Sequence, residues 1–246
     1  MRILSVFVLL VVAAVPAAMQ GGTVTFSGVG APSGSTHSVD VSATFKNVGS
    51  NLEIDVFNNA TGTDPLQILS GLLWNVNGSA PSGTSLSSAV TGSGSDLYTS
   101  GSSGTPNAEL RNSVLGGGNG WQYLAPPGPL NSVSFQYGFG CSGLGGTFGG
   151  LGNASYGAIG PSSDIGHVPL SNQLPLVMST SASASEADFV ISGFNVDVSN
   201  IKNVTFAFGS AGTNNIIGGI PIPEPSTFLL AALGLFALFV RSPKRA

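Results

Sequence analysis

Charged side chains are scarce in this chain. Only 7% of its 246 residues are charged, against about 25% in an average globular protein. The chain holds seven lysine and arginine residues in total, and a nucleic-acid binder needs a basic patch, so that class of protein is excluded. The Glu, Lys, Leu and Ala residues at helical spacing that build a coiled coil or helical bundle are also missing. A hydrophobic fraction of 42% excludes a highly charged disordered chain.

Cysteine and histidine are rarer still, and their scarcity removes further classes. Cys141 is the only cysteine, so the chain forms no intrachain disulfide and is not a disulfide scaffold. The two histidines, His37 and His167, belong to no zinc-binding motif. We therefore expect no metal site and no cofactor, with a single weak calcium site built partly from backbone carbonyls left open. Cys141 lies in a glycine-rich stretch that offers no base, so we expect an inert thiol.

The amino-terminal end has the three parts of a secretory signal peptide. One basic residue is followed by the apolar run of residues 3–15 and then by the small residues Ala17 and Ala18. Cleavage after Ala17 is favoured because suitable residues then stand three and one before the cut, and cleavage after Ala18 is the alternative. We expect residues 1–17 to direct export through the secretion machinery and then to be removed.

The carboxyl-terminal end holds a short hydrophobic segment with a basic flank. No residue from Thr227 to Val240 is charged. As a helix the segment would span roughly 21 Å, which is short of a hydrocarbon core of about 30 Å. Positive charge after the segment holds such a tail in the cytoplasm, and long basic side chains extend its effective span by snorkelling. The basic residues of this flank are Arg241, Lys244 and Arg245.

A Pro-Glu-Pro sequence precedes the hydrophobic segment, and the three parts together resemble the PEP-CTERM sorting signal of Gram-negative bacteria. Residues from Phe228 to Val240, with Arg241, match the helix and the basic stop of that signal. The resemblance implies a tail inserted in the membrane and then recognised by an exosortase, a membrane transpeptidase that cleaves near the Pro-Glu-Pro. An ordinary tail anchor that stays in the mature protein is the alternative. The residues of the motif are Pro223, Glu224 and Pro225.

The same resemblance implies a cellular location for the protein and divides the chain into three segments. Proteins with this signal are exported, reach the cell envelope, cell surface or extracellular matrix, and are linked to extracellular polysaccharide or biofilm. Residues 222–246 would form the sorting and anchor segment, after a body of residues 18–221 and the signal peptide.

We predict that the body is an all-β, antiparallel β-sandwich of roughly eight to twelve short strands. Apolar and polar residues alternate with period two, and no segment has a convincing helical pattern. Residues 39–45 and 52–56, joined by a turn-rich connector, predict a hairpin. The strand that we expect at residues 69–76 contains Trp74. Further strands are expected at residues 24–26, 133–137, 189–191, 194–198 and 204–208, the last of these directly before the tail.

Two stretches rich in glycine and serine, residues 78–120 and 138–152, are expected to be long loops and the protease-sensitive parts of the body. Residues 138–143 match the G-x-G-x-x-G dinucleotide pattern, but a stretch that is itself mostly glycine follows where the pattern needs a helix. We therefore reject a nucleotide site there.

Two pairs of carboxylates are the only arrangement that points towards an enzyme. Glu53 and Asp55 lie two residues apart, as do Glu186 and Asp188, so each pair faces one side of a strand. Paired carboxylates can cleave glycosidic bonds. The alternation of Glu53 and Asp55 with apolar residues is instead typical of a solvated face, so we expect no catalytic residues and no enzyme.

Trp121 and Tyr123 are the candidates for contact with carbohydrate. A glycine run precedes them and two prolines follow, so they lie beside loops, where aromatic rings can stack on sugars. Packing of a loop onto the sandwich is the commoner role for such residues, and it is the one that we favour for them.

The charge of the body limits its partners. Ten acidic and three basic side chains in residues 18–222 give a formal charge of −7, which disfavours nucleic acid and anionic lipid. We expect a non-enzymatic structural protein of the surface or matrix, associated with exopolysaccharide. A carbohydrate-binding module that uses the loop aromatics is the alternative, and a glycoside hydrolase is a remote one.

Overall fold

The structure is a computed structural model, and it describes residues 22–60, 65–98, 104–111, 120–142, 144, 147–148, 157–161, 176–180, 184–209 and 215–222. The expected signal peptide and the hydrophobic segment of residues 227–240 lie outside these ranges. Within them, no helix is both long and apolar enough to cross a membrane.

The described residues form strands and two short 3-10 helices, η1 (Pro65–Gln67) and η4 (Val198–Asn200). An all-β, mostly antiparallel fold is therefore confirmed. The strands are β1 (Thr23–Gly30), β2 (Val39–Val48), β3 (Asn51–Asn58), β4 (Leu69–Val76), β5 (Ser85–Thr91), β6 (Ser95–Tyr98), β7 (Gly104–Pro106), β8 (Gln122–Leu124), β9 (Tyr137–Gly140), β10 (Ala158–Pro161), β11 (Leu176–Ser179), β12 (Ser185–Ser192), β13 (Ile201–Phe208), β14 (Ile216–Gly218) and β15 (Ile220–Ile222).

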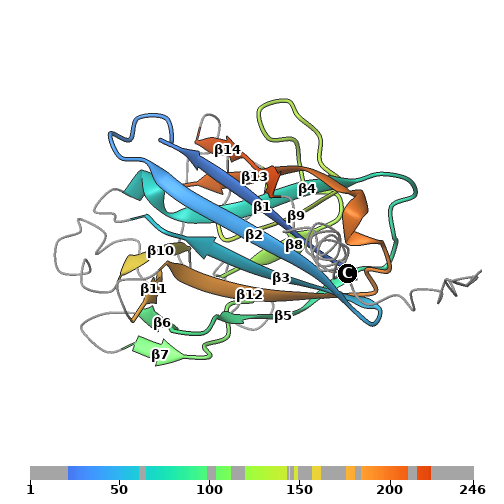
Figure 1. Cartoon of the computed structure of the whole chain (residues 1–246), viewed down its shortest axis with the longest axis horizontal. Helices are drawn as coiled ribbons and strands as arrows, with labels where there is room; N and C mark the ends of the chain where they lie inside the picture. The colour runs from blue at the N-terminus through green and yellow to red at the C-terminus, as the bar shows by residue number, and fades with distance from the viewer. Residues whose placement is uncertain are drawn as a thin grey trace, which may run out of the picture.

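The first sheet has six antiparallel strands in the order β15-β1-β2-β3-β12-β5. Figure 1 shows β1, β2, β3 and β12 side by side. Burial alternates strictly along β12 and along β3, as period-two patterning predicts for a sheet with one buried and one solvated face. The neighbours β3 and β12 are far apart in sequence, so this pairing is set by tertiary structure and not by a local turn.

The hairpin of β2 and β3 is confirmed. The two strands are paired up to Val48 and Asn51, so Gly49 and Ser50 alone form the turn. Gly49 has a φ of 62°, a left-handed conformation that glycine adopts without steric cost. This two-residue turn fixes the register that places Phe45 and Ile54 opposite each other on the buried face.

The second sheet has nine strands. Its main path is β14-β13-β4-β10-β11-β6-β7, with β9 paired to β4 and β8 paired to β9. One pair, β10 with β11, is parallel, so the sheet is not purely antiparallel. The inner faces of both sheets contribute to one hydrophobic core, which is the arrangement that a sandwich requires.

Trp74 on β4 is the centre of that core and is fully buried, as the sequence predicts. Its ring lies 5.6 Å from that of Phe45 on the first sheet, in edge-to-face geometry, and 5.9 Å from that of Tyr137 on β9. Aromatic pairs at such spacings add stabilisation beyond their buried area. The rings of Tyr123, Phe139 and Phe194 also contact Trp74.

A second, smaller core covers the opposite side of β4. Leu73 and Ala207 face it from the second sheet. They pack with Leu130, Phe135, Leu144 and Phe148, which come from the segment around β9. This segment explains why β4 is buried on both faces and reads as a continuous apolar run.

Several sequence-based predictions of strands are wrong in detail. The described residues form fifteen strands instead of eight to twelve, because short strands such as β6, β7 and β8 give no period-two signal. The predicted loop of residues 78–120 contains β5, β6 and β7, and that of residues 138–152 overlaps β9. Residues 99–103, 112–119, 143, 145–146 and 149–152 of these two stretches lie outside the described ranges.

Local backbone conformation explains two further errors. Asn131 and Ser132 both have positive φ and form a tight turn between Leu130 and Val133. The strand that we expected at residues 133–137 is therefore not formed, and β9 begins only at Tyr137. Gly193, with a φ of 76°, ends β12, and η4 begins within the strand that we expected at residues 194–198. The segment of residues 204–208 is a strand but not the last one, since β14 and β15 follow.

Candidate functional site

The outer face of the six-stranded sheet gathers hydroxyl and carboxyl side chains from successive strands. Residues directly opposite each other in the ladders share one face, so the registers define rows across the sheet. One row contains Thr25, Thr44, Asp55, Asp188 and Val90. A parallel row contains Ser27, Ser42, Phe57 and Glu186. The Oγ1 atoms of Thr25 and Thr44 are 3.0 Å apart and hydrogen-bonded.

The structure brings the two carboxylate pairs of the sequence together on this face. Asp188 lies directly opposite Asp55, and Glu53 and Glu186 flank them on the same side of the sheet. The sequence revealed the spacing within each pair but not this meeting, because β3 and β12 are neighbours only in the folded chain. All four side chains are partly buried. The alternation in the sequence predicted a solvated face, but on this face the carboxylates are less accessible to water than that prediction implies.

Gly92 explains how the carboxylates fit. A Cβ atom at Gly92 would lie 2.2 Å from Cγ of Glu186 and 2.8 Å from Oδ1 of Asp188. The side chains of Glu186 and Asp188 therefore lie over Gly92, the residue after β5, in the space that a side chain at that position would fill. Oδ1 of Asp188 is buried without a hydrogen-bond partner. At least this oxygen of the group is therefore packed against the sheet, away from water.

This packing raises the pKa values of three of the four carboxyl groups. Burial, with the charges of Asp55 and Glu53, raises the pKa of Asp188 to about 6. Burial, with the charges of Asp188 and Asp55, raises the pKa of Glu186 to about 7. The pKa of Asp55 is also raised, first by burial and then by Glu53, while Lys46 opposes the shift. Lys46 contacts Glu53 at 3.4 Å.

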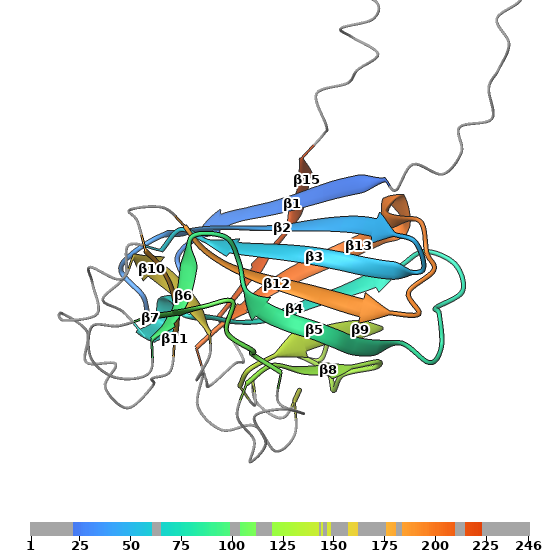
Figure 2. The same ribbon diagram turned by 90° about the horizontal axis from the view of Figure 1, so that it is seen from below.

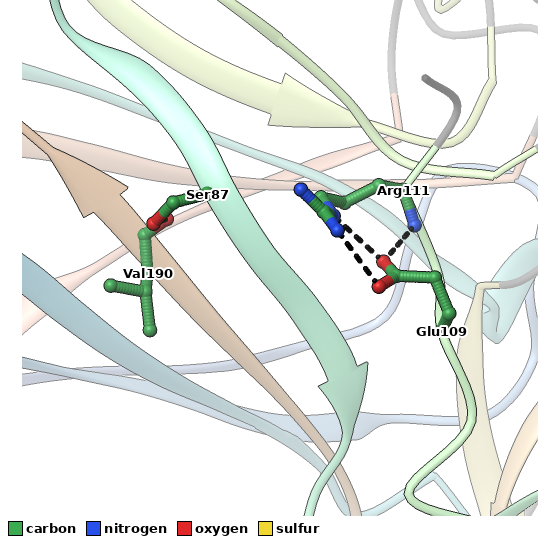
Figure 3. A network of polar contacts seen from close by, with 4 residues as sticks. All are labelled: Ser87, Glu109, Arg111 and Val190. Carbon is green, nitrogen blue, oxygen red and sulfur yellow. Dashed lines mark hydrogen bonds and ion pairs between the residues drawn. The ribbon is translucent and has the colours of Figure 1, made fainter. Parts of the chain in front are cut away.

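A second ion pair continues the outer face beyond β5. Glu109 lies opposite Val90 in an isolated bridge, next to the row that contains Asp188. Arg111 binds its carboxylate through two side-chain contacts, 2.9 Å from Nε to Oε1 and 3.1 Å from Nη2 to Oε2 (Figure 3). Burial raises the pKa of Glu109, but hydrogen bonds from Arg111 outweigh it and lower the pKa overall. Nearby, Ser87 donates to the carbonyl of Val190 and ties β5 to β12 (Figure 3).

Lys46 and Arg111 are therefore each held by one carboxylate, Glu53 and Glu109 respectively. Within the described residues, no ion pair is found for Asp55, Glu186 or Asp188. The outer face is a polar surface with a net excess of carboxyl groups. No group of three or more His, Cys, Asp and Glu side chains in the described part of the chain is placed to hold a metal ion.

The structure does not support the sugar-stacking role of Trp121. Only 1% of this residue is exposed. Its ring packs edge-on against Phe139 at 5.5 Å and Phe189 at 5.0 Å, between the two sheets. A buried indole has no free face for a sugar, and this burial agrees with packing as the favoured role. The backbone N–H of Trp121 also donates to the carbonyl of Leu110.

Tyr123 is also committed to the fold. It belongs to β8, is partly buried beside the main core, and its hydroxyl lies 2.8 Å from Oγ1 of Thr84. Burial raises the pKa of this phenol. The pair of loop aromatics is thus a packing feature in which only Tyr123 retains partial exposure.

An open depression of about 220 Å³ lies elsewhere on the molecule. Its lining is mostly small and apolar, with Gln136 as the main polar group, and it contains none of the carboxylates. The lining residues are Ala80, Pro81, Ala125, Pro126, Gln136 and Tyr137.

Cys141 lies at the end of β9 with 1% of its surface exposed. Burial raises the pKa of the thiol, so the unreactive protonated form dominates at neutral pH. The glycines near it serve close packing: a Cβ at Gly140 would lie 2.8 Å from the ring of Phe148. The dinucleotide pattern is thus part of a strand that packs against the second core.

The second candidate region is the corner where β1 meets β15. Thr25 pairs with Ile222 in antiparallel register, so the start of β1 and the end of β15 lie at the same end of the sheet edge. Figure 2 shows β15 beside β1. The expected signal-peptide cut at Ala17 or Ala18 lies a few residues before Thr23, and the Pro-Glu-Pro directly follows Ile222. Both end segments of the chain therefore join the body at one corner.

The remaining predicted site residues lie outside the described ranges. They are the signal cleavage residues Ala17 and Ala18, the motif Pro223, Glu224 and Pro225, and the tail residues Thr227, Phe228, Val240, Arg241, Lys244 and Arg245.

Comparison with known proteins identifies the carboxyl-terminal region. No curated protein and no solved structure matches the chain. Residues 221–245 match the family model of the PEP-CTERM protein-sorting motif, which confirms the resemblance. The chain therefore carries a PEP-CTERM sorting signal, which indicates export, sorting to the cell surface and an exosortase as its processing partner.

Proposed function

We propose that the body is a non-enzymatic structural component of the cell surface or extracellular matrix, and that it associates with exopolysaccharide through the outer face of its six-stranded sheet. The observation that carries this proposal is the continuous row of hydroxyl and carboxyl side chains across that face, from Thr25 to Asp188. Hydrated polysaccharide presents many weak hydrogen-bonding groups. A broad polar face offers many weak partners in return, and needs no deep pocket.

The charge of this face narrows the class of polymer. Asp55, Glu186 and Asp188 have no cationic partner among the described residues, so the face is acidic at neutral pH. An acidic face repels uronate-rich or sulfated polymers at low ionic strength. We therefore propose neutral glycans as the favoured partners, bound through hydroxyl groups such as those of Thr25 and Thr44.

The test is retention of the purified protein on the exopolysaccharide of the producing bacterium and on a glycan array. The double variant Thr25→Val/Thr44→Val removes two hydroxyls from the face but keeps β-branched side chains of similar size, so we expect weaker retention with an intact fold. Thr105→Val on β7, an exposed threonine of the other sheet, is the matched control and should bind like the unaltered protein. Equal retention of all three proteins would overturn the assignment to this face.

One observation favours a second candidate function, glycoside hydrolysis. The convergence of Asp55, Glu186 and Asp188 brings together three carboxyl groups with raised pKa, and a general acid is a carboxyl group of this kind. Packing over Gly92 argues against this candidate, since the groups are turned onto the sheet. The release of new reducing ends from the same polysaccharide, lost in Glu186→Gln and Asp188→Asn, would favour the enzyme over the structural role.

A further inference from the structure

We propose that β15 leaves the edge of the six-stranded sheet before the tail is processed. Residues 220–222 would then have two roles, first as an edge strand of the body and afterwards as the leading part of the segment that the processing enzyme binds. This inference rests on the match to the sorting motif and on the geometry of β15. It does not depend on the association of the body with polysaccharide.

The strand and the sorting motif overlap in sequence. The match to the motif begins at residue 221, and β15 spans Ile220–Ile222. The last of these residues is paired with Thr25, and Pro223 is the next residue of the chain. While β15 is docked, no spacer separates the folded body from the Pro-Glu-Pro.

The missing spacer creates a steric problem for a membrane-bound enzyme. One residue of extended chain spans at most about 3.6 Å, so a docked β15 leaves no more than this length of chain between Ile222 and Pro223. The body itself is broad, since β2 alone has ten residues and is thus about 33 Å long. Release of residues 220–222 would add about 11 Å of extended chain, enough to move the motif away from the sheet.

The sheet holds β15 weakly. Its pairing with β1 comprises three residue pairs, and all three residues of the strand are exposed. Pro221 has no N–H group to donate to the ladder. Ile220 is 71% exposed and Ile222 is 46% exposed, so neither residue loses much buried apolar contact when the strand detaches. Exposed elements with few contacts are those that open locally under native conditions.

A fixed point precedes the weak strand. The N–H of Gly219 donates to the carbonyl of Val204 at 2.8 Å. A Cβ at Gly219 would lie 3.1 Å from Cβ of Phe26 and 3.2 Å from Cβ of Val204, so the backbone is closely packed there. Before it, β14 is paired with β13 in the second sheet, and Ile217 is buried. Release can therefore stop at Gly219 and leave the rest of the body folded.

A disulfide that holds β15 on β1 tests the inference in the full chain. Residues directly opposite each other in an antiparallel pair have Cα atoms about 4.5–5.5 Å apart, within the range of a disulfide. Thr25→Cys/Ile222→Cys would fix the strand, and Ser27→Cys/Ile220→Cys is a second pair if the first does not oxidise. Cys141 is buried and should not interfere. The readout, by intact mass after a pulse of synthesis in the producing bacterium, is the fraction of protein that keeps residues 226–246.

The matched control is Thr25→Cys/Thr44→Cys, which adds a disulfide between β1 and β2 and leaves β15 free. We expect the oxidised pinned chain to be processed at least about tenfold more slowly than this control, because the binding-competent population falls. Reduction with dithiothreitol should restore processing. A Gly-Ser linker of about four residues inserted between Ile222 and Pro223 should also restore it, because the linker separates the sorting motif from the body while β15 stays docked. Processing of the oxidised pinned chain at the rate of the control would overturn the inference.

Discussion

Asp188 on β12 lies directly opposite Asp55 on β3, at the centre of the outer face of the six-stranded sheet. Like charges placed directly opposite each other destabilise a sheet. Burial, together with this repulsion, raises the pKa of Asp188 to about 6 and that of Glu186 to about 7. Lys46, which is paired with Glu53, opposes the rise in the pKa of Asp55.

Stability should therefore rise as the pH falls from 8 to about 5.5. The folded-state pKa values of Asp188 and Glu186 lie above the unfolded values of about 4. Their contribution is thus fully present below pH ~4 and is lost as the pH rises through about 6 to 7. Urea unfolding at several pH values measures this. A midpoint that falls steadily from pH 8 to 5.5 would contradict the assignment.

Asp188→Asn should stabilise the protein at pH 8 and reduce the pH dependence. Removal of one of two opposed carboxylates relieves repulsion worth a few tenths to about 1 kcal/mol. Asp40→Asn is the control, since Asp40 is exposed on the same sheet and pairs with Val29 instead of an acid. Equal shifts of the unfolding midpoint in both variants would show that overall charge, and not the Asp55–Asp188 contact, sets the effect.

Asn58 connects four parts of the fold and should be intolerant of change. Its buried side chain donates to the carbonyls of Gln67 and Ala158, both at 2.8 Å, and accepts from the N–H of Ala60 at 3.1 Å. Its own carbonyl accepts from Ser185. Asn58→Ala leaves three buried groups without partners, so we expect a loss of about 2–4 kcal/mol in unfolding experiments. Exposed Asn195→Ala should have little effect. Similar losses in both variants would contradict the role of Asn58.

Trp121→Ala should reduce stability, because its ring packs edge-on against the stacked rings of Phe139 and Phe189 in the core. Truncation of a buried tryptophan costs about 3–5 kcal/mol. Trp121→Phe keeps an aromatic ring and should lose less. Thermal unfolding separates this role from sugar binding: a Trp121→Ala protein with unchanged melting temperature but lost glycan binding would restore the stacking hypothesis.

Cys141 should not react with thiol reagents in the native protein. The side chain is buried, and its pKa is raised by burial. Labelling followed by mass spectrometry should show modification only after addition of denaturant. Rapid labelling without denaturant would mean that the segment around β9 opens in the native state.

The strands that could be predicted from sequence are those with a long alternating pattern. Residue type alone placed β4 and most of β2, β3 and β13, because these segments alternate or run apolar over at least five residues. Strands of three or four residues escape this approach, because so short a segment has no period to detect. For Trp121 the sequence favoured packing but left sugar contact open, because flanking glycines and prolines do not reveal the tertiary contacts that bury the ring.

The sequence predicted the two carboxylate pairs of the outer face, but not that the pairs lie next to each other. Spacing placed Glu53 with Asp55 and Glu186 with Asp188, because residues two apart share one side of a strand. Their meeting depends on the pairing of β3 with β12, which no local signal encodes. The sorting motif is the opposite case. It is a linear signal, readable without any fold, and only its overlap with β15 required the structure.

Processing of the chain is tested most directly by the intact mass of the protein recovered from the surface or matrix fraction of the producing bacterium. We predict one mature species that begins at residue 18 or 19 and has lost the tail after a cut near Pro223 to Pro225. Its mass would be smaller than the 24.6 kDa of the full chain by the mass of both end segments. A surface-bound species that still contains residues 227–246 would contradict processing at the sorting motif.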